Sequence, residues 1–121
     1  MSKTSKMLGN LGENMARKYL QEHGYKIVCS NYRCKIGEID IIAYKNDSYI
    51  FVEVKTRRNF SFGRPIEAIT PNKVRTIMKV AQCYMSNFKL YSFGMRFDAI
   101  EVIILPSRVP EINHIENIAM I

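Results

Sequence analysis

Apolar and polar residues recur at helical and strand-like spacings along this chain, and these spacings predict its secondary structure. In residues 11–22 the apolar positions repeat every three or four residues, which predicts a helix. Gly24 follows at the place where a glycine commonly ends a helix. Residues 25–32 then indicate a short strand, so a helix followed by a strand is expected in the first part of the chain.

The clearest local pattern is a pair of segments, 38–44 and 49–55, that flank the turn-like sequence Lys45-Asn46-Asp47-Ser48. Both segments are rich in β-branched and aromatic residues and alternate in polarity, which is typical of strands. Strands joined by so short a loop form an antiparallel hairpin. We therefore predict a hairpin whose turn is centred between the asparagine and the aspartate of that loop.

The register of this hairpin decides which side chains share a face. Counting outward from the turn places Asp40 opposite Glu53, and Glu38 opposite Lys55. These charged residues share a face with aromatic and apolar residues nearer the turn, so that face is expected to be partly covered. The other face is wholly apolar and is expected to be core: it carries Ile39, Ile41, Ala43, Ile50, Val52 and Val54.

A second helix and a last strand are expected further along. Thr70 and Pro71 are residue types typical of a helix N-cap and a first helical position. A strand is expected over 96–105, whereas the segment 106–121 is apolar but irregular and favours neither a short strand nor a helical turn. The buried stripe expected for the second helix consists of Val74, Ile77, Met78, Ala81, Met85 and Phe88.

Length and composition bound the class of protein. The 121 residues suffice for one domain, expected over 1–121 with 1–7 as a flexible tail. No apolar run approaches the ~18 residues that a membrane span needs, and the polar start resembles no signal peptide, so we predict a cytoplasmic protein without a membrane partner. Cys29, Cys34 and Cys83 match neither a CxxC pair nor a zinc spacing and are expected to be reduced thiols.

The charge of the chain favours anionic partners. Its formal net charge is +7. Basic faces are often plain solvated surface, so the charge alone leaves a nucleic-acid partner and an ordinary surface equally open. Between Val54 and Phe97, a single acid, Glu67, stands against nine cations: Lys55, Arg57, Arg58, Arg64, Lys73, Arg75, Lys79, Lys89 and Arg96.

The pairing of Asp40 with Glu53 needs an explanation, because like charges directly opposite each other destabilise a strand pair. A cation between them removes that cost, and hard divalent metals prefer oxygen ligands. In Glu53-x-Lys55 the intervening valine points to the core, so the ammonium shares the face of the carboxylates, where it is expected to orient a water or help to deprotonate it beside the metal. The alternative is that these are solvated charges, with Lys55 pairing Glu38 or Glu53 for little energy.

Four further residues are weaker candidates. Glu13 lies at the edge of the first helix's apolar stripe, and Lys73 occupies the third helical position after Thr70; both patterns are also those of ordinary surface residues. Phe60 and Phe62 lie in a basic loop and are candidates for stacking on bases.

The combination of motifs resembles a known family over about residues 8–105. That family is the YraN-like family of uncharacterised bacterial proteins, which are predicted endonucleases distantly similar to archaeal Holliday-junction resolvases of the PD-(D/E)XK nuclease superfamily. Each motif alone is unspecific, and the likeness rests on their order. The motifs include Gly12-Glu13-x2-Ala16-x2-Tyr19-Leu20, Gly37-Glu38-Ile39-Asp40-Ile41-Ile42-Ala43, Phe51-Val52-Glu53-Val54-Lys55, Phe62-Gly63-x-Pro65 and Arg96-Phe97-Asp98.

The resemblance implies a fold and a site. The fold is an α/β restriction-endonuclease-like core, in which helices flank a central mixed β-sheet. In the site, Asp40 and Glu53 bind Mg²⁺ or Mn²⁺, Lys55 assists the attacking water, and Glu13 completes the metal site. Ile39 stands where the superfamily name has a proline, a variation that leaves the chemistry intact.

The resemblance also implies partners, namely nucleic acid, with DNA favoured over RNA, and a homodimer. The first hypothesis is a Mg²⁺- or Mn²⁺-dependent endodeoxyribonuclease that cuts branched or single-stranded DNA. The alternatives are a catalytically silent nucleic-acid-binding module of a repair or recombination complex, and a scaffold whose basic face meets an acidic protein. The residues expected to grip phosphates are Arg57, Arg58, Arg64, Lys73 and Arg75, with Phe60 and Phe62 against bases.

Overall fold

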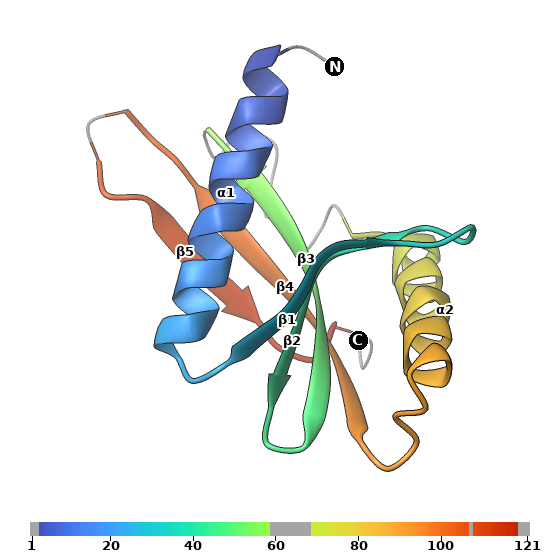
Figure 1. Ribbon diagram of the computed structural model, residues 1–121. Coiled ribbons are helices and arrows are strands. Elements are labelled where there is room, and N and C mark those ends of the chain that lie inside the picture. The colour runs from blue at the N-terminus through green and yellow to red at the C-terminus, as the bar shows by residue number, and fades with distance from the viewer. Residues whose placement is uncertain (1–2, 59–68, 107, 119–121) are drawn as a thin grey trace.

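One mixed sheet with a helix on each face makes up the fold of this protein, seen in a computed structural model that describes residues 3–58, 69–106 and 108–118 (Figure 1). Along the chain lie α1 (Lys3–Glu22), β1 (Lys26–Arg33), β2 (Glu38–Lys45), β3 (Ser48–Arg57), α2 (Pro71–Asn87), β4 (Gly94–Ile103) and β5 (Glu111–Ile115). The sheet has the order β1-β2-β3-β4-β5, in which β3 and β4 are parallel and the other neighbours are antiparallel. The expected α/β class, with a mixed sheet flanked by helices, is confirmed.

The first helix is longer than its apolar stripe indicated. It begins at Lys3, so it includes most of the segment 1–7 that the sequence analysis assigned to a tail. It ends as expected at Gly24, whose φ of +85° is the left-handed conformation that glycine adopts without a steric cost. The Gly24 amide donates to the carbonyl of Gln21 (3.2 Å) and the Tyr25 amide donates to that of Leu20 (2.9 Å), a Schellman pattern that satisfies the last carbonyls.

The hairpin of β2 and β3 has the predicted turn. Asn46 and Asp47 have φ values of +51° and +60°, as a two-residue type I′ turn requires. The predicted register is confirmed along the ladder as far as the pair Ile41 and Val52. In the described structure the β2–β3 ladder ends there, so the pairings expected beyond that point are not backbone pairs.

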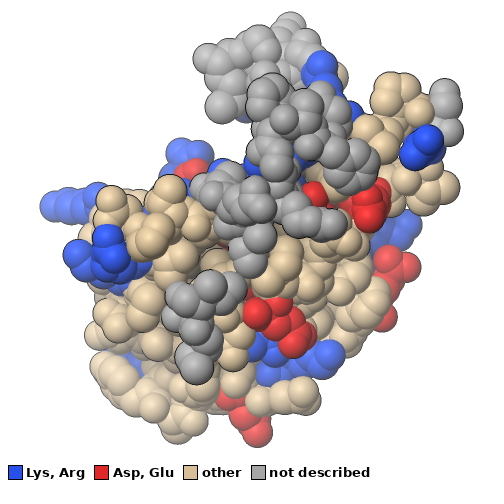
Figure 2. Space-filling model, turned by 180° about the vertical axis from the view of Figure 1, so that it is seen from behind, with Lys and Arg blue, Asp and Glu red and all other residues tan. Residues whose placement is uncertain are grey.

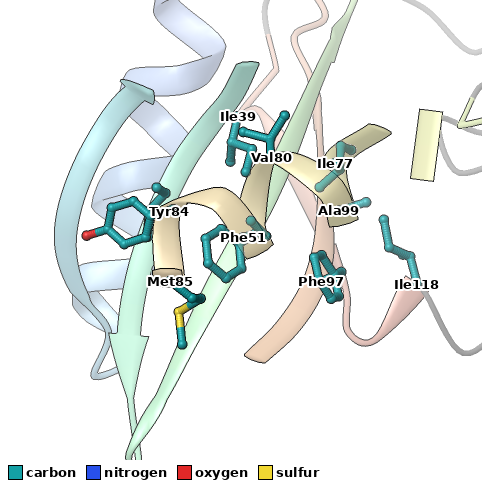
Figure 3. Packing of buried hydrophobic residues seen from close by; sticks show 11 residues of the cluster. Ile39, Phe51, Ile77, Val80, Tyr84, Met85, Phe97, Ala99 and Ile118 are labelled. Carbon is teal, nitrogen blue, oxygen red and sulfur yellow. The ribbon is translucent and has the colours of Figure 1, made fainter. Parts of the chain in front are cut away.

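Two apolar clusters lie on the two sides of the sheet. The one under α1 includes Ala16 and Leu20 with most of the predicted apolar face of the hairpin. Ile39 is buried as expected but belongs to the other cluster, under α2, together with Phe51 and Phe97 (Figure 3).

The exception at Ile39 has a local cause. In β1, Asn31 has a φ of +54°, which is a left-handed backbone conformation inside a strand. The β1–β2 ladder pairs Ser30 with Ile41 and Tyr32 with Ile39 on either side of Asn31. This register is continuous across Asn31, so the change of face at Ile39 coincides instead with the end of the β2–β3 ladder at Ile41 and Val52, beyond which the Asp40 carboxylate accepts the backbone hydrogen bond of β3.

The second helix begins as predicted. Thr70 is its N-cap and accepts a hydrogen bond from the Lys73 amide (3.1 Å), with Pro71 in the first turn. The expected buried stripe is correct in its centre but not at its end, because α2 ends at Asn87 and Phe88 is 59% exposed.

The C-terminal segment 106–121 is not irregular throughout. It contains β5, which pairs antiparallel with β4 from the pair Ala99 and Ile115 to the pair Ile103 and Glu111. A five-residue strand carries a weak local signal, and here the pairing with β4 supplies what its own sequence does not.

Candidate functional site

The site forms where β2 and β3 separate. Beyond the last ladder pair, the Val54 amide donates to the Oδ2 atom of Asp40 at 2.8 Å, so a side-chain carboxylate takes the place of a backbone carbonyl as acceptor. This contact holds Asp40 in the opening between the two strands. The predicted juxtaposition of Asp40 with Glu53 is therefore kept through side chains, although the two are not paired in the ladder.

Glu53 is the most perturbed acid of this opening. It is buried, and its burial together with the negative charge of Asp40 raises the pKa of Glu53 to about 7. A side-chain hydrogen bond between Glu53 and Asp40 acts in the same direction. Burial also raises the pKa of Asp40, against the opposing effect of the hydrogen bond from Val54. The two carboxyl groups thus hold a proton more tightly than free acids, in the position where a cation would otherwise offset their repulsion.

Two lysines from different elements approach the same carboxylate oxygen. The Nζ atom of Lys55, on β3, lies 3.8 Å from Oε1 of Glu53, and the Nζ atom of Lys73, on α2, lies 3.7 Å from it. The shared face of Glu53 and Lys55 is confirmed. Lys73 was assigned from the sequence to phosphate binding alone, whereas the fold also brings its ammonium to the carboxylates.

Glu13 reaches the same region from α1. Its burial and the charge of Asp40 raise its pKa, while Arg17 and a hydrogen bond from the Asn31 side chain oppose the rise. The approach of the helix depends on Gly12, since a Cβ atom there would lie 1.8 Å from Oγ1 of Thr56 on β3. Asn31, in the irregular part of β1, is a site neighbour that the sequence analysis missed.

Among the described residues, Asp40 and Glu53 form a close pair, and Glu13 lies near Asp40 without completing a set of three metal ligands. Within the described part of the chain, no three His, Cys, Asp or Glu side chains stand in an arrangement that could hold a metal ion. Asp40 and Glu53 are close together, whereas Glu13 is affected by the charges of Asp40 and Glu38. Glu38, expected opposite Lys55, instead forms an ion pair with Arg33 (2.8 Å) at the exposed end of β1.

The other residues singled out from the sequence are dispersed. Arg57 is half-buried at the end of β3, and Arg58 is exposed directly after it. Arg75 is exposed on α2, where it bonds the side chain of Asn72. On the face seen in Figure 2, cationic groups lie in separate patches with acidic groups between them. Phe60, Phe62 and Arg64 lie outside the described residues.

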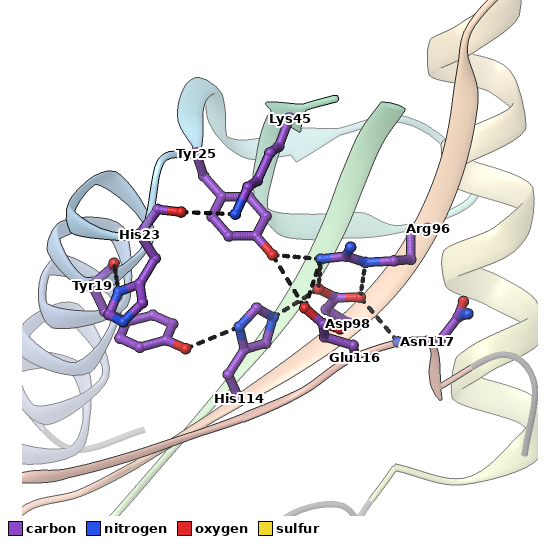
Figure 4. Close-up of polar contacts among 9 residues, drawn as sticks. All are labelled: Tyr19, His23, Tyr25, Lys45, Arg96, Asp98, His114, Glu116 and Asn117. Atoms are coloured by element: carbon purple, nitrogen blue, oxygen red, sulfur yellow. Dashed lines mark hydrogen bonds and ion pairs between the residues drawn. The ribbon is translucent and has the colours of Figure 1, made fainter. Parts of the chain in front are cut away.

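A second polar cluster, which the sequence analysis missed, lies around Asp98 on β4 (Figure 4). Asp98 is fully buried and accepts hydrogen bonds from Arg96 at 2.9 and 2.8 Å and from the Asn117 amide at 3.0 Å. The Nε2 atom of His114, on β5, lies 2.7 Å from the same carboxylate. Burial alone would raise the pKa of Asp98, but these hydrogen bonds outweigh it and lower the pKa.

This cluster has a structural role. The Tyr19 hydroxyl on α1 lies 3.1 Å from Nδ1 of His114, and Arg96 donates to the Tyr25 hydroxyl at 2.6 Å. The network therefore connects the end of α1 with β4 and β5, and its buried charges are paired. Its signal in the sequence is Arg96-x-Asp98, two charges on one face of an otherwise apolar strand.

The fold and the site together define an α/β protein with paired carboxylates and two lysines at the open end of a β-hairpin. Residues 12–102 match the family described as "Uncharacterised protein family UPF0102", and the chain belongs to that family. The match covers all the site residues named above, from Glu13 to Lys73.

Similar proteins occur in several bacteria, and each is named only as a UPF0102 protein. The chain is 47% identical over 116 residues to one from Caldanaerobacter subterraneus, which covers 93% of each chain. It is 46% identical over 113 residues to one from Alkaliphilus metalliredigens (93% of this chain and 97% of the relative). It is 48% identical over 113 residues to one from Clostridioides difficile (93% and 96%). None of the described helices is long and apolar enough to cross a membrane.

Proposed function

We propose that this protein is a Mg²⁺- or Mn²⁺-dependent endonuclease with a restriction-endonuclease-like core, which hydrolyses phosphodiester bonds in branched or single-stranded DNA. The observation that carries the proposal is the convergence of Asp40, Glu53, Lys55 and Lys73 from β2, β3 and α2 at one opening. The two acids have raised pKa values because they are buried beside each other, and cations flank them. Such perturbed groups are more typical of a reaction centre than of a solvated surface.

The donor set fits a hard divalent cation. Mg²⁺ is typically held by one or two carboxylates, with substrate phosphate and water as its other ligands, so Asp40 and Glu53 are a sufficient protein contribution. Glu13, whose pKa responds to Asp40, would contribute to the metal site by holding a water ligand of the ion. When bound, such an ion neutralises charge on the phosphodiester and lowers the pKa of a coordinated water.

The two lysines take complementary parts in this proposal. Lys55 shares a strand face with Glu53 and orients the attacking water through its ammonium group. Lys73 comes from the first turn of α2 and stabilises the negative charge that develops on the phosphate oxygens. Both ammonium groups are within 4 Å of one carboxylate oxygen, so both are held at the centre before any substrate arrives.

The nucleic acid would be held chiefly through its backbone. Arg58 and Arg75 are exposed, and with Arg57, Arg64, Phe60 and Phe62 they complete the proposed contact set. Phosphate contacts supply affinity and register but little sequence information, so selection by shape is expected. Because a four-way junction is cut at two symmetric points, the proposal includes a two-fold homodimer for that substrate.

The test is cleavage of labelled four-way junction, flap, single-stranded and duplex DNA, each with Mg²⁺, Mn²⁺ or EDTA. Metal-dependent cutting is expected for the wild type and is expected to vanish for Glu53→Gln and for Lys55→Ala. Glu22→Gln is the control, because it removes one exposed acid at the far end of α1, and it should cut normally. Salt-sensitive binding of all four substrates without cutting would overturn the nuclease assignment in favour of a silent binding module.

A further inference from the structure

A hollow of about 510 Å³ lies at the opposite end of the hairpin from the carboxylates. Its volume is in the range of ordinary ligand sites. In Figure 1 this is the lower end of the sheet, where the β2–β3 turn and the loop before β4 lie. It is lined by Lys26, Ile27 and Val28 of β1, Tyr44 and Tyr49 of the hairpin, and Phe93.

The three aromatic rings of this hollow hold one another in place. The ring centroids of Tyr44 and Tyr49 are 5.1 Å apart, those of Tyr49 and Phe93 5.4 Å, and those of Tyr44 and Phe93 6.0 Å, all with edge-to-face geometry. The Tyr44 hydroxyl also donates to Oδ1 of Asp47 in the turn at 3.0 Å. The aromatic wall is therefore formed in advance of any ligand, which reduces the entropy lost on binding.

The hollow shares a sheet face with the candidate site. Tyr49, Phe51, Glu53 and Lys55 alternate on the α2 face of β3, so Tyr49 lies about 13 Å along the strand from Glu53. Phe51 lies between these two residues and is buried under α2, so a strand that reaches both ends passes around the helix along the edge of the sheet.

The edge of the sheet connects the two ends. β1 is an edge strand, and a smaller hollow of about 230 Å³ lies near its far end, lined by Arg33, Cys34, Gly37 and Glu38. The two hollows therefore mark the ends of one side of the molecule along β1, with Lys26 at one end and Arg33 at the other. Basic residues beside partly exposed aromatic rings are a combination by which proteins bind single strands.

We propose that the aromatic hollow binds an unpaired nucleobase of a single-stranded segment, a few nucleotides from the bond held at Glu53. This rests on the proposed function and narrows its substrate to nucleic acid with an unpaired arm. The base stacks against the rings of Tyr44 and Phe93, and Lys26 pairs with an adjacent phosphate. The net charge of +7 favours this polyanion over an uncharged peptide as the occupant of the hollow.

The test distinguishes the contribution of base contacts to binding affinity from the contribution of charge. Binding of fluorescent oligothymidylate is compared, by anisotropy with Ca²⁺ in place of a catalytic metal, with an abasic oligonucleotide of the same length and charge. Since stacking contributes ~1–3 kcal/mol per base, the wild type should bind oligothymidylate at least about five-fold more tightly. Tyr44→Leu and, independently, Phe93→Leu should bring that ratio close to one. Tyr91→Leu, which changes an aromatic residue that is 74% exposed and outside the lining set, should leave it unchanged.

Equal affinity of the wild type for the two oligonucleotides would overturn the proposal, as would an unchanged ratio in both lining variants. This binding test and the cleavage test can succeed or fail independently of each other. Metal-dependent cutting without base-dependent binding would remove the role of the hollow and leave the nuclease. Base-dependent binding lost in the lining variants, without any cutting, would keep the hollow and remove the nuclease.

Discussion

Glu53 is a buried acid whose pKa is strongly raised by its surroundings. It is buried beside Asp40, and two ammonium groups within 4 Å do not prevent its pKa from rising to about 7. A buried acid with a raised pKa stabilises the folded state only while it is protonated, because the unfolded chain releases that proton at a lower pH. Thermal stability thus reports on this residue without any assay of activity.

The first prediction follows from the sign of this shift. The folded-state pKa of Glu53 is raised from 4.5 to about 7, so its contribution is fully present below the lower value and is lost as pH rises through the upper one. In EDTA, the melting temperature should therefore fall between about pH 5 and about pH 8, by several degrees for a change on the order of a few kcal/mol. Glu53→Gln should flatten this part of the profile.

A further prediction concerns the melting temperature in the presence of a divalent metal. If Asp40 and Glu53 share an ion, Mg²⁺ or Mn²⁺ should raise the melting temperature most at the alkaline end, where both acids are charged. Calorimetric melts of wild type, Glu53→Gln and the exposed-acid control Glu22→Gln give the comparison. An equal metal-induced shift in all three would count against a shared site at this opening.

Lys73 carries the second prediction at this scale. Its charge lowers the pKa of Glu53, so removing it should raise that pKa further and weaken metal binding near neutral pH. Titration calorimetry of Mn²⁺ binding by Lys73→Met should show affinity recovering at higher pH than in the wild type. Lys79→Met, an exposed lysine on the same helix, is the matched control. A pH profile identical to that of the wild type would mean that Lys73 does not act on Glu53.

The positions of some site residues relative to one another could be predicted from the sequence. The alternation of Glu53-x-Lys55 fixes a shared strand face, and the structure agrees. The contact of Lys73 with Glu53 could not be predicted, because no local sequence pattern indicates which end of a helix packs against which strand. Asp98 was missed for a related reason, since its partners come from β4, β5 and the residues after β5.

At the scale of elements, Gly12 sets how closely α1 approaches β3. A Cβ atom at this position would lie 1.8 Å from Oγ1 of Thr56 and 2.8 Å from its Cβ and Cγ2 atoms, so the helix and strand would have to move apart. Glu13 is the next residue of α1, and its proximity to Asp40 depends on that approach. The glycine is therefore part of the way in which the site acid is positioned.

We predict that Gly12→Ala lowers the free energy of unfolding by ~1–3 kcal/mol, the usual cost of overpacking. Gly9→Ala on the same helix should instead raise it by ~0.5–1 kcal/mol, because nothing lies within 4 Å of a Cβ there and alanine favours the helix. Urea denaturation of the two variants measures both values. Equal effects would show that α1 does not pack against Thr56 as closely as described.

Elements with a strong local pattern were the ones that the sequence predicted. The β2–β3 hairpin has a turn with two positive φ values and a consistent alternation, and its register followed from those alone. The position of Ile39 did not follow, because the β2–β3 ladder ends at Ile41 and Val52 and no local pattern marks that end. β5 was missed because its stability comes from pairing with β4 and from the packing of Ile112 and Ile115 on opposite faces.

At the scale of the whole molecule, the net charge of +7 is spread over several surfaces, and the proposed reaction uses only some of it. The sheet brings acids and lysines together at one end and aromatic residues with Lys26 at the other. A bound strand would meet Arg57 and Arg58, at the end of β3, beside the first of these ends. Those arginines should thus govern affinity in a way that is independent of the base sequence.

The last prediction is a salt dependence. The double variant Arg57→Ala, Arg58→Ala should weaken binding to every duplex sequence alike and reduce the slope of log affinity against log salt by about one or two, since each neutralised phosphate contributes ~0.9. Lys18→Ala, an exposed lysine on α1, removes one charge elsewhere and should leave the slope nearly unchanged. Anisotropy titrations over a range of salt measure these slopes in Ca²⁺. A loss confined to particular sequences would instead mean that the arginines contact base edges, and the protein would then select sites by sequence rather than by shape.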